Sequence, residues 1–183
     1  PVMLNECLEG LRIRPDGIYV DVTFGGGGHS RAILQKLGPK GHLFSFDQDP
    51  DAEKNIADAP SNFTFVRSNF RYLKNWMRYY GVDHIDGLLA DLGVSSHHLD
   101  DAERGFAFRF DAPLDMRMNI RAGRTAADLL ADADDRELTR LFTLYGELRQ
   151  SRRMAQAIVK RRMQQPILTT GDLMAAIKPL ISP

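Results

Sequence analysis

The sequence predicts an α/β fold in which a Rossmann-like parallel sheet is joined to a helical subdomain. Three observations support this fold class. Strand-like and helical patterns alternate in the first half of the chain, four consecutive glycines follow the first strand, and from Thr125 onwards the pattern is helical throughout. Alternating β and α elements are typical of a parallel sheet that helices cover on both faces.

Each element has a local signal. The first strand runs into the glycines, and the helix after it stops at Gly38-Pro39. We expect strands at residues 18–24, 42–46, 63–66 and 85–90, and helices between them at 30–37, 51–57 and 72–80.

The second half of the chain has a different character. Residues 93–115 are rich in Gly, Asp, His and Phe without a sustained period, which predicts a long loop of the kind that is usually functional or mobile. Further helices are expected at residues 125–130, 134–145, 150–164 and 169–177. We therefore place a boundary within residues 106–123 and divide the chain into an α/β domain, 1–110, and a helical subdomain, 111–183.

Charge and composition exclude several classes of protein. The 183 residues are 43% hydrophobic, and 24 Lys and Arg balance 24 Asp and Glu, so any attraction to nucleic acid must be local. Cys7 is the single cysteine, which excludes an intramolecular disulfide and fits a reducing cytoplasm. No apolar stretch approaches the roughly 18 residues that span a bilayer. We expect a cytoplasmic protein without a membrane partner.

The strongest local signal is the segment from Asp21 to Ser30, in which a strand ends in an acidic residue and a glycine run leads into a helix. Glycines allow a tight backbone turn and leave room for a ligand against the main chain. Asp47 follows about 20 residues later at the end of the second strand, where a carboxylate can accept both hydroxyls of a ribose. The pattern indicates a cofactor that contains adenosine.

Two cofactors that contain adenosine, NAD and S-adenosylmethionine, are consistent with this pattern. A dinucleotide fingerprint requires G-x-G-x-x-G, but Ser30 stands in the third glycine place after Gly25 and Gly27. The carboxylate of Asp21, four residues before Gly25, instead completes D-x-x-x-G-x-G, the form that methyltransferases use. The spacing favours S-adenosylmethionine over NAD, and Asp21 would suit the ammonium group of its amino-acid tail.

The end of the fourth strand supports the same choice. Asp91 follows that strand, and ligands of open α/β sheets bind at the carboxyl ends of strands, near the switch in strand order. Asp21, Asp47 and Asp91 should therefore converge on one crevice. An aspartate after a strand is more commonly a helix cap or a turn former, but three at three relevant strand ends favour a binding site.

Two further residues are candidates near the cofactor. Phe70, after the third strand, could cover an adenine ring by stacking, although a phenylalanine there is more often part of the core. His29 could contact the cofactor through its backbone or simply begin the helix.

Six strings of the sequence resemble one family closely, the bacterial 16S ribosomal RNA cytosine-N4 methyltransferases, often called MraW or RsmH. The strings are residues 1–6, 17–30, 47–50, 91–96, 99–106 and 113–118, which together span nearly the whole chain. The last three strings are highly specific to the family.

The resemblance implies a function and a set of site residues. It implies N4-methylation of a cytosine in the ribosomal P site, with the 16S RNA of the small subunit as partner, S-adenosylmethionine as cofactor and no metal. The positions that match the family's cofactor site are Gly27, Gly28, His29, Asp47, Phe70, Asp91 and His98. Many relatives carry Pro-Gln where this chain has His97-His98, and spacing alone gave no reason to choose His98. Such a sheet normally has seven strands, so we expect the remaining three after residue 183.

The chemistry of the reaction points to Asp91 as the candidate catalytic group. Cytosine N4 is a poor nucleophile because its lone pair is delocalised, so the site must position it and accept its hydrogen bonds. Many amino methyltransferases carry Asp-Pro-Pro-aromatic after the fourth strand, whereas residues 91–94 here are Asp-Leu-Gly-Val. Phe106, Phe108 and Phe110 could supply the missing stacking surface or could pin their loop to the core.

One cluster of cations could contact RNA. No acidic residue stands between its first and last members, which are Arg149, Arg152, Arg153, Lys160, Arg161 and Arg162. Such a run is usually a solvated helix face, but it could also contact phosphates. Two other readings stay open, an NAD-dependent oxidoreductase and a non-catalytic RNA-binding module, and so does association into a homodimer.

Overall fold

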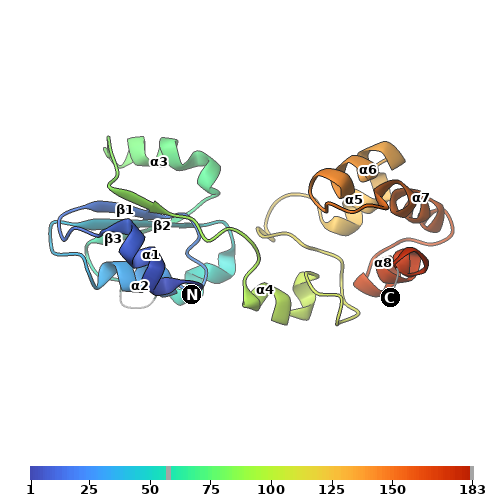
Figure 1. Cartoon of the computed structure of the whole chain (residues 1–183), viewed down its shortest axis with the longest axis horizontal. Helices are drawn as coiled ribbons and strands as arrows, with labels where there is room; N and C mark the ends of the chain where they lie inside the picture. The colour runs from blue at the N-terminus through green and yellow to red at the C-terminus, as the bar shows by residue number, and fades with distance from the viewer. Residues whose placement is uncertain (57–58, 182–183) are drawn as a thin grey trace. The chain divides into compact units, whose positions relative to one another are not determined.

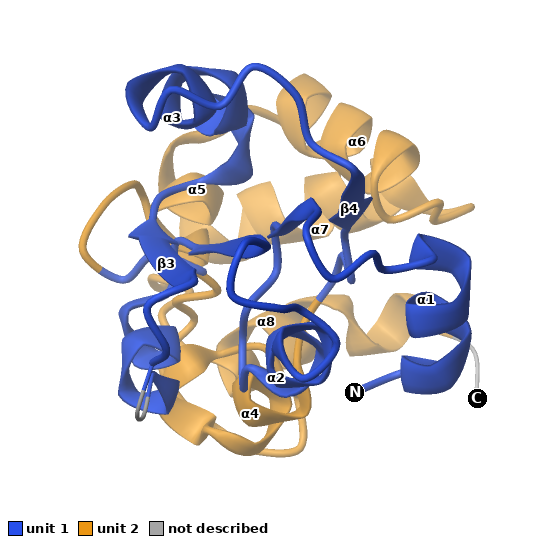
Figure 2. Ribbon diagram, turned by 90° about the vertical axis from the view of Figure 1, so that its left-hand side faces the viewer, with its two compact units in different colours: residues 1–93, 118–120 blue, residues 94–117, 121–183 orange. Residues whose placement is uncertain are grey.

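The computed structural model describes residues 1–56 and 59–181, which form two compact units (Figure 2). The sheet unit consists of Pro1–Gly93 and Met118–Ile120, and the helical unit of Val94–Arg117 and Arg121–Pro183. Contacts thus group residues 94–117 with the helices. The functional division that we placed after residue 110 stays a prediction.

The sheet unit contains four parallel strands, which confirms the predicted α/β fold. They are β1 (Ile18–Asp21), β2 (His42–Asp47), β3 (Phe63–Arg67) and β4 (Gly87–Leu89), in the order β3-β2-β1-β4. Consecutive strands step outwards from β1 to β3, and β4 then pairs with the other side of β1. The switch in strand order therefore lies between the carboxyl ends of β1 and β4, where open α/β sheets bind ligands.

Helices cover both faces of this sheet (Figure 1). Successive strand residues point to opposite faces. Tyr19 packs with α1 (Leu4–Leu11) and α2 (Gly28–Leu34) on one face, and Val20 packs with α3 (Leu73–Tyr79) on the other. The sequence did not predict α1, because the residue before it, Met3, is not a typical N-cap residue and makes no side-chain cap.

Several elements differ from the predicted ranges. The first strand stops at Asp21 because the Asp21 carboxylate accepts from the Thr23 N–H and turns the backbone. In place of the helix expected at 51–57, a 3-10 helix, η1, spans Pro50–Asn55, and Ala57 lies outside the described residues. A second 3-10 helix, η2 (Phe70–Tyr72), precedes α3.

The helical unit contains the four helices expected after residue 125. They are α5 (Ala126–Asp132), α6 (Asp135–Leu144), α7 (Ser151–Arg162) and α8 (Thr170–Ile177), followed by the 3-10 helix η4 (Lys178–Leu180). Side chains of Thr125, Asp134 and Thr169 cap α5, α6 and α8 at their N-termini. The fully buried Leu138 lies in the core that these helices share.

The predicted loop at 93–115 is partly helical, which corrects the sequence analysis. It contains α4 (Ser96–Asp100) and η3 (Ala102–Arg104). Ser95 and His98 form a reciprocal capping box at the start of α4. The usual signature places Glu or Gln where His98 stands, so the signal was not recognisable in the sequence.

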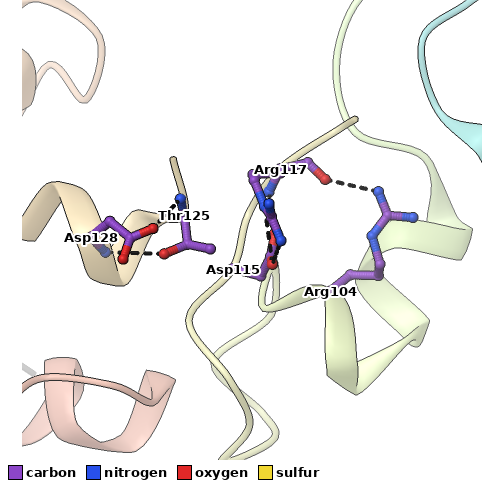
Figure 3. A network of polar contacts seen from close by, with 5 residues as sticks. All are labelled: Arg104, Asp115, Arg117, Thr125 and Asp128. Atoms are coloured by element: carbon purple, nitrogen blue, oxygen red, sulfur yellow. Dashed lines mark hydrogen bonds and ion pairs between the residues drawn. The ribbon is translucent and has the colours of Figure 1, made fainter. Parts of the chain in front are cut away.

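Polar contacts order the segment that leads into α5 (Figure 3). The Arg117 guanidinium donates to both carboxylate oxygens of Asp115, at 2.9 and 2.6 Å, which holds the pKa of Asp115 below its usual range. The buried Arg104 donates to the Arg117 carbonyl at 2.9 Å. Within the same network, Thr125 and Asp128 cap α5.

Candidate cofactor site

The glycine turn between β1 and α2 has a backbone that requires glycine. Gly25 and Gly27 have φ angles of 49° and 72°, in the left-handed region that side chains disfavour. The Gly27 N–H donates to the Phe24 carbonyl at 2.7 Å and closes the turn. No heavy atom lies within 4 Å of where a side chain on Gly26 would begin, so the tip of the turn faces open space.

Asp47 joins the end of β2 to this turn. One of its carboxylate oxygens accepts from the Gly25 N–H at 2.8 Å, and the other accepts from the Asp49 N–H at 2.9 Å. An ionised carboxylate offers about four acceptor positions, so each oxygen keeps room for another donor. The half-buried Asp47 is thus fixed in place and still able to accept two hydroxyl groups.

Asp21 is a brace inside the turn, which corrects the expectation that it faces a ligand. It is 0% exposed, and its carboxylate accepts from the Ser30 hydroxyl at 2.6 Å and from the Thr23 N–H at 3.0 Å. Burial raises the pKa of Asp21, against the opposing effect of these hydrogen bonds. The Ser30 hydroxyl also lies 2.7 Å from that of Ser45. Ser30 therefore joins α2 to both β1 and β2. It stands at the position where a dinucleotide fingerprint has its third glycine.

The end of β4 is tied to the same turn. The Asp91 N–H donates to the Thr23 hydroxyl at 2.8 Å, and the Asp91 side chain is exposed. The ring of His29 is buried, with one nitrogen 3.0 Å from the Val2 carbonyl and the other 4.0 Å from the Asp91 carboxylate. Sequence reasoning missed Thr23, for which the Asp-x-Thr pattern after the strand was the available signal.

The remaining predicted residues are placed differently. A side chain on Gly28 would clash with the ring of Pro1. Phe70 is 45% exposed, and Asn69 before it donates to the Gln48 side chain at 2.9 Å, which links the ends of β3 and β2. An exposed ring at this position fits a stacking role better than a role in the core.

His98 belongs to the helical unit, where its ring already has partners. Its Nδ1 accepts from the Ser95 N–H at 3.1 Å, and its ring centroid lies 5.2 Å from that of Phe106. The sheet unit by itself places Asp47 and Asp91 at the glycine turn, with His29 packed against Asp91. The contact implied for His98 stays a prediction.

The three loop phenylalanines differ in their surroundings. Phe106 packs on His98, and the Arg109 guanidinium lies 4.9 Å from the centre of the Phe110 ring. Phe108 is 79% exposed. Phe106 therefore pins its loop to the protein, whereas Phe108 and Phe110, both exposed, keep the stacking hypothesis.

The basic run also divides into two groups. Arg162 donates to the Leu130 and Ala133 carbonyls, both at 2.6 Å, and so satisfies the end of α5. Arg161 is half-buried, whereas the other four side chains of the run are exposed.

No helix of the described residues is long and apolar enough to cross a membrane.

Comparison with known proteins gives one family. The model of the MraW methylase family matches residues 1–183. The proteins named ribosomal RNA small subunit methyltransferase H from Phocaeicola vulgatus and Parabacteroides distasonis are 62% and 64% identical over 180 residues, which is 98% of this chain and 59% of each relative. The protein of that name from Porphyromonas gingivalis is 61% identical over 186 residues, covering 100% of this chain and 60% of the relative. The chain thus spans about 60% of the length of these relatives.

Proposed function

Because the chain belongs to the MraW methylase family, we propose that it carries the S-adenosylmethionine site and the substrate-positioning helices of a ribosomal RNA methyltransferase. The proposed reaction is N4-methylation of a cytosine in the P-site region of 16S ribosomal RNA. Because the proposed substrate belongs to the small ribosomal subunit, we expect the activity in the cytoplasm.

The observation that carries the cofactor assignment is the geometry of Asp47 at the glycine turn. Its two oxygens are held by the N–H groups of Gly25 and Asp49 and keep free acceptor positions, as a pair of ribose hydroxyls requires. The open face at Gly26 leaves room for the ligand. Ser30, buried on Asp21, replaces the third glycine that brings helix and strand together in dinucleotide sites. These features fit S-adenosylmethionine better than NAD.

Within this site the residues would divide the work. Asp47 would bind the ribose, and the exposed ring of Phe70 would stack on the adenine. When bound, S-adenosylmethionine supplies a methyl group activated by the adjoining sulfonium.

Asp91 is the proposed catalytic group. Its backbone is fixed by Thr23, and its exposed carboxylate can accept a hydrogen bond from an exocyclic amine. Such a bond would orient the N4 nitrogen for in-line attack and stabilise the positive charge that develops on it.

Two measurements test the proposal on the full-length protein. Calorimetric titration should give saturable binding of S-adenosylmethionine and none of NAD. Incubation with labelled S-adenosylmethionine and small subunits that lack the modification should yield N4-methylcytosine on nucleoside analysis. Binding of NAD alone, or a label on another nucleoside, would contradict the proposal.

A further inference from the structure

The connection between α6 and α7 presents an unusual combination of side chains. Arg149 in this connection and Arg152 and Arg153 in the first turn of α7 are exposed. Tyr145, at the end of α6, is 81% exposed. We define these four residues as the hairpin surface. The helices on either side of it pack against each other, and the Leu148 N–H donates to the Phe142 carbonyl at 3.1 Å, so the connection is held in place.

The arginines of this surface lack carboxylate partners in the part of the chain that the structure describes. Other arginines of the same unit are paired, for example Arg117 with Asp115 and Arg124 with Asp132, at 2.6 and 2.9 Å. Arg153 donates to the neutral side chain of Gln150, at 3.1 Å. Glu147 is the single acidic residue between positions 145 and 162, and no ion pair joins it to the surface. The positive charge is therefore available to a partner.

The stability of α7 does not account for this placement. Arg152 and Arg153 stand in the first turn, where the helix dipole disfavours cations, and Gln150 provides no side-chain cap. The first turns of α5, α6 and α8 instead contain acidic residues and receive a side-chain cap. An arrangement that opposes local stability indicates that another requirement selected these residues.

We propose that the hairpin surface binds single-stranded RNA, with the three arginines on successive phosphates and Tyr145 stacked on a base. The combination fits this partner because a guanidinium pairs with phosphate and every nucleobase offers a face for aromatic stacking. The inference rests on the proposed function and names the residues that contact its substrate. It excludes Arg162, which is occupied by the end of α5.

The experiment measures binding of a single-stranded 16S RNA fragment to the full-length protein across a salt series. The variant R149Q/R152Q/R153Q should weaken binding and lower the slope of log affinity against log salt by up to about 2, since each phosphate contact contributes about 0.7 on a single strand. The matched control is K36Q/K40Q/K74Q, which removes the same charge from exposed positions of the sheet unit. It should leave the slope unchanged.

Tyr145 gives an independent readout. The Tyr145→Ala variant should lose about 5- to 100-fold in affinity without a change in slope, and Tyr145→Phe should bind as the original protein does. The Arg162→Gln variant should lower the melting temperature but leave the slope unchanged.

Parallel slopes and equal affinities for the arginine variant and the original protein would overturn the inference, as would equal effects of the two triple variants. Failure of this inference is distinguishable from failure of the proposed function. If the protein methylates cytosine N4 normally and the arginine variant binds RNA as the original protein does, only the RNA-binding role of the hairpin surface is refuted. Salt-dependent RNA binding at the hairpin surface without S-adenosylmethionine binding refutes the function alone.

Discussion

The two units use aspartate in opposite ways. In the sheet unit, Asp21 and Asp47 accept hydrogen bonds from the turn that follows β1 and from the start of α2, and so fix the shape of the turn. In the helical unit, Asp128 and Asp172 stand in the first turns of α5 and α8 and accept from backbone N–H groups there. The same side chain therefore shapes the proposed cofactor turn in one unit, where Asp49 also caps η1, and serves helix starts in the other. Substitutions confined to one unit test how far this division of roles holds.

The largest expected effect is a loss of stability confined to the helical unit. Leu138 is fully buried in its core, and Leu138→Ala should reduce the free energy of unfolding of that unit by about 2–5 kcal/mol because of lost burial and the cavity left behind. Helical circular dichroism reports mainly on this unit, while Trp76, the single tryptophan, reports on the sheet unit through its fluorescence. The exposed Leu144, changed to alanine, is the control. Simultaneous loss of both signals would refute the expectation that the two units unfold independently.

The next effect concerns the cofactor site alone. Asp47→Ala should weaken S-adenosylmethionine binding by about 1.5–3 kcal/mol, because a charged acceptor is lost. Calorimetry measures the change, and Asp16→Ala, which removes an exposed carboxylate of the same unit, should have no effect. An affinity within about twofold of the original would remove Asp47 from the site.

A smaller effect is expected at a helix cap. The Thr169 hydroxyl accepts from the Asp172 N–H at 3.1 Å, so Thr169→Ala should reduce the stability of the helical unit by about 1 kcal/mol. Thr169→Ser keeps the hydroxyl and should restore most of it. Urea denaturation followed by circular dichroism provides the measurement, and an alanine variant as stable as the serine variant would argue against the cap.

The smallest effect is a difference in response to acid. Hydrogen bonds lower the pKa of Asp115, Asp128 and Asp172, so their stabilising contribution is present above the unfolded pKa of about 4 and is lost as the pH falls through the folded values. Burial raises the pKa of Asp21, so the folded sheet unit binds that proton more tightly, and protonation there favours folding. Burial lowers the pKa of His42 in the sheet unit, so that unit loses some stability as the pH falls below about 6.5. On further titration from about pH 5 to pH 3, where the carboxylates titrate, helical circular dichroism should fall before Trp76 fluorescence changes. The reverse order would contradict the comparison.

The sequence predicted the parallel sheet because its strands are flanked by glycines and aspartates and alternate with helices. It predicted Asp47 and Asp91 for the same reason, since both follow strands that end at one edge. It could not distinguish the buried Asp21 from these two, because a local pattern does not reveal that Ser30 and Thr23 occupy its carboxylate. The short helix α4 was missed because its capping box uses His98.

Thr23 has a consequence for how the two substrates of the proposed reaction affect each other's binding. Its hydroxyl accepts from the Asp91 N–H and donates to Asp21 at 3.3 Å. This side chain extends the link between β1 and β4 beyond the last backbone bond, from the Val22 N–H to the Leu89 carbonyl. A ligand that shifts the glycine turn must also shift Asp91, and occupancy of one substrate site should change the affinity of the other. Thermodynamic linkage makes this effect reciprocal. Replacing Thr23 by valine should weaken this coupling, which is measured as the change in S-adenosylmethionine affinity when the RNA substrate is added.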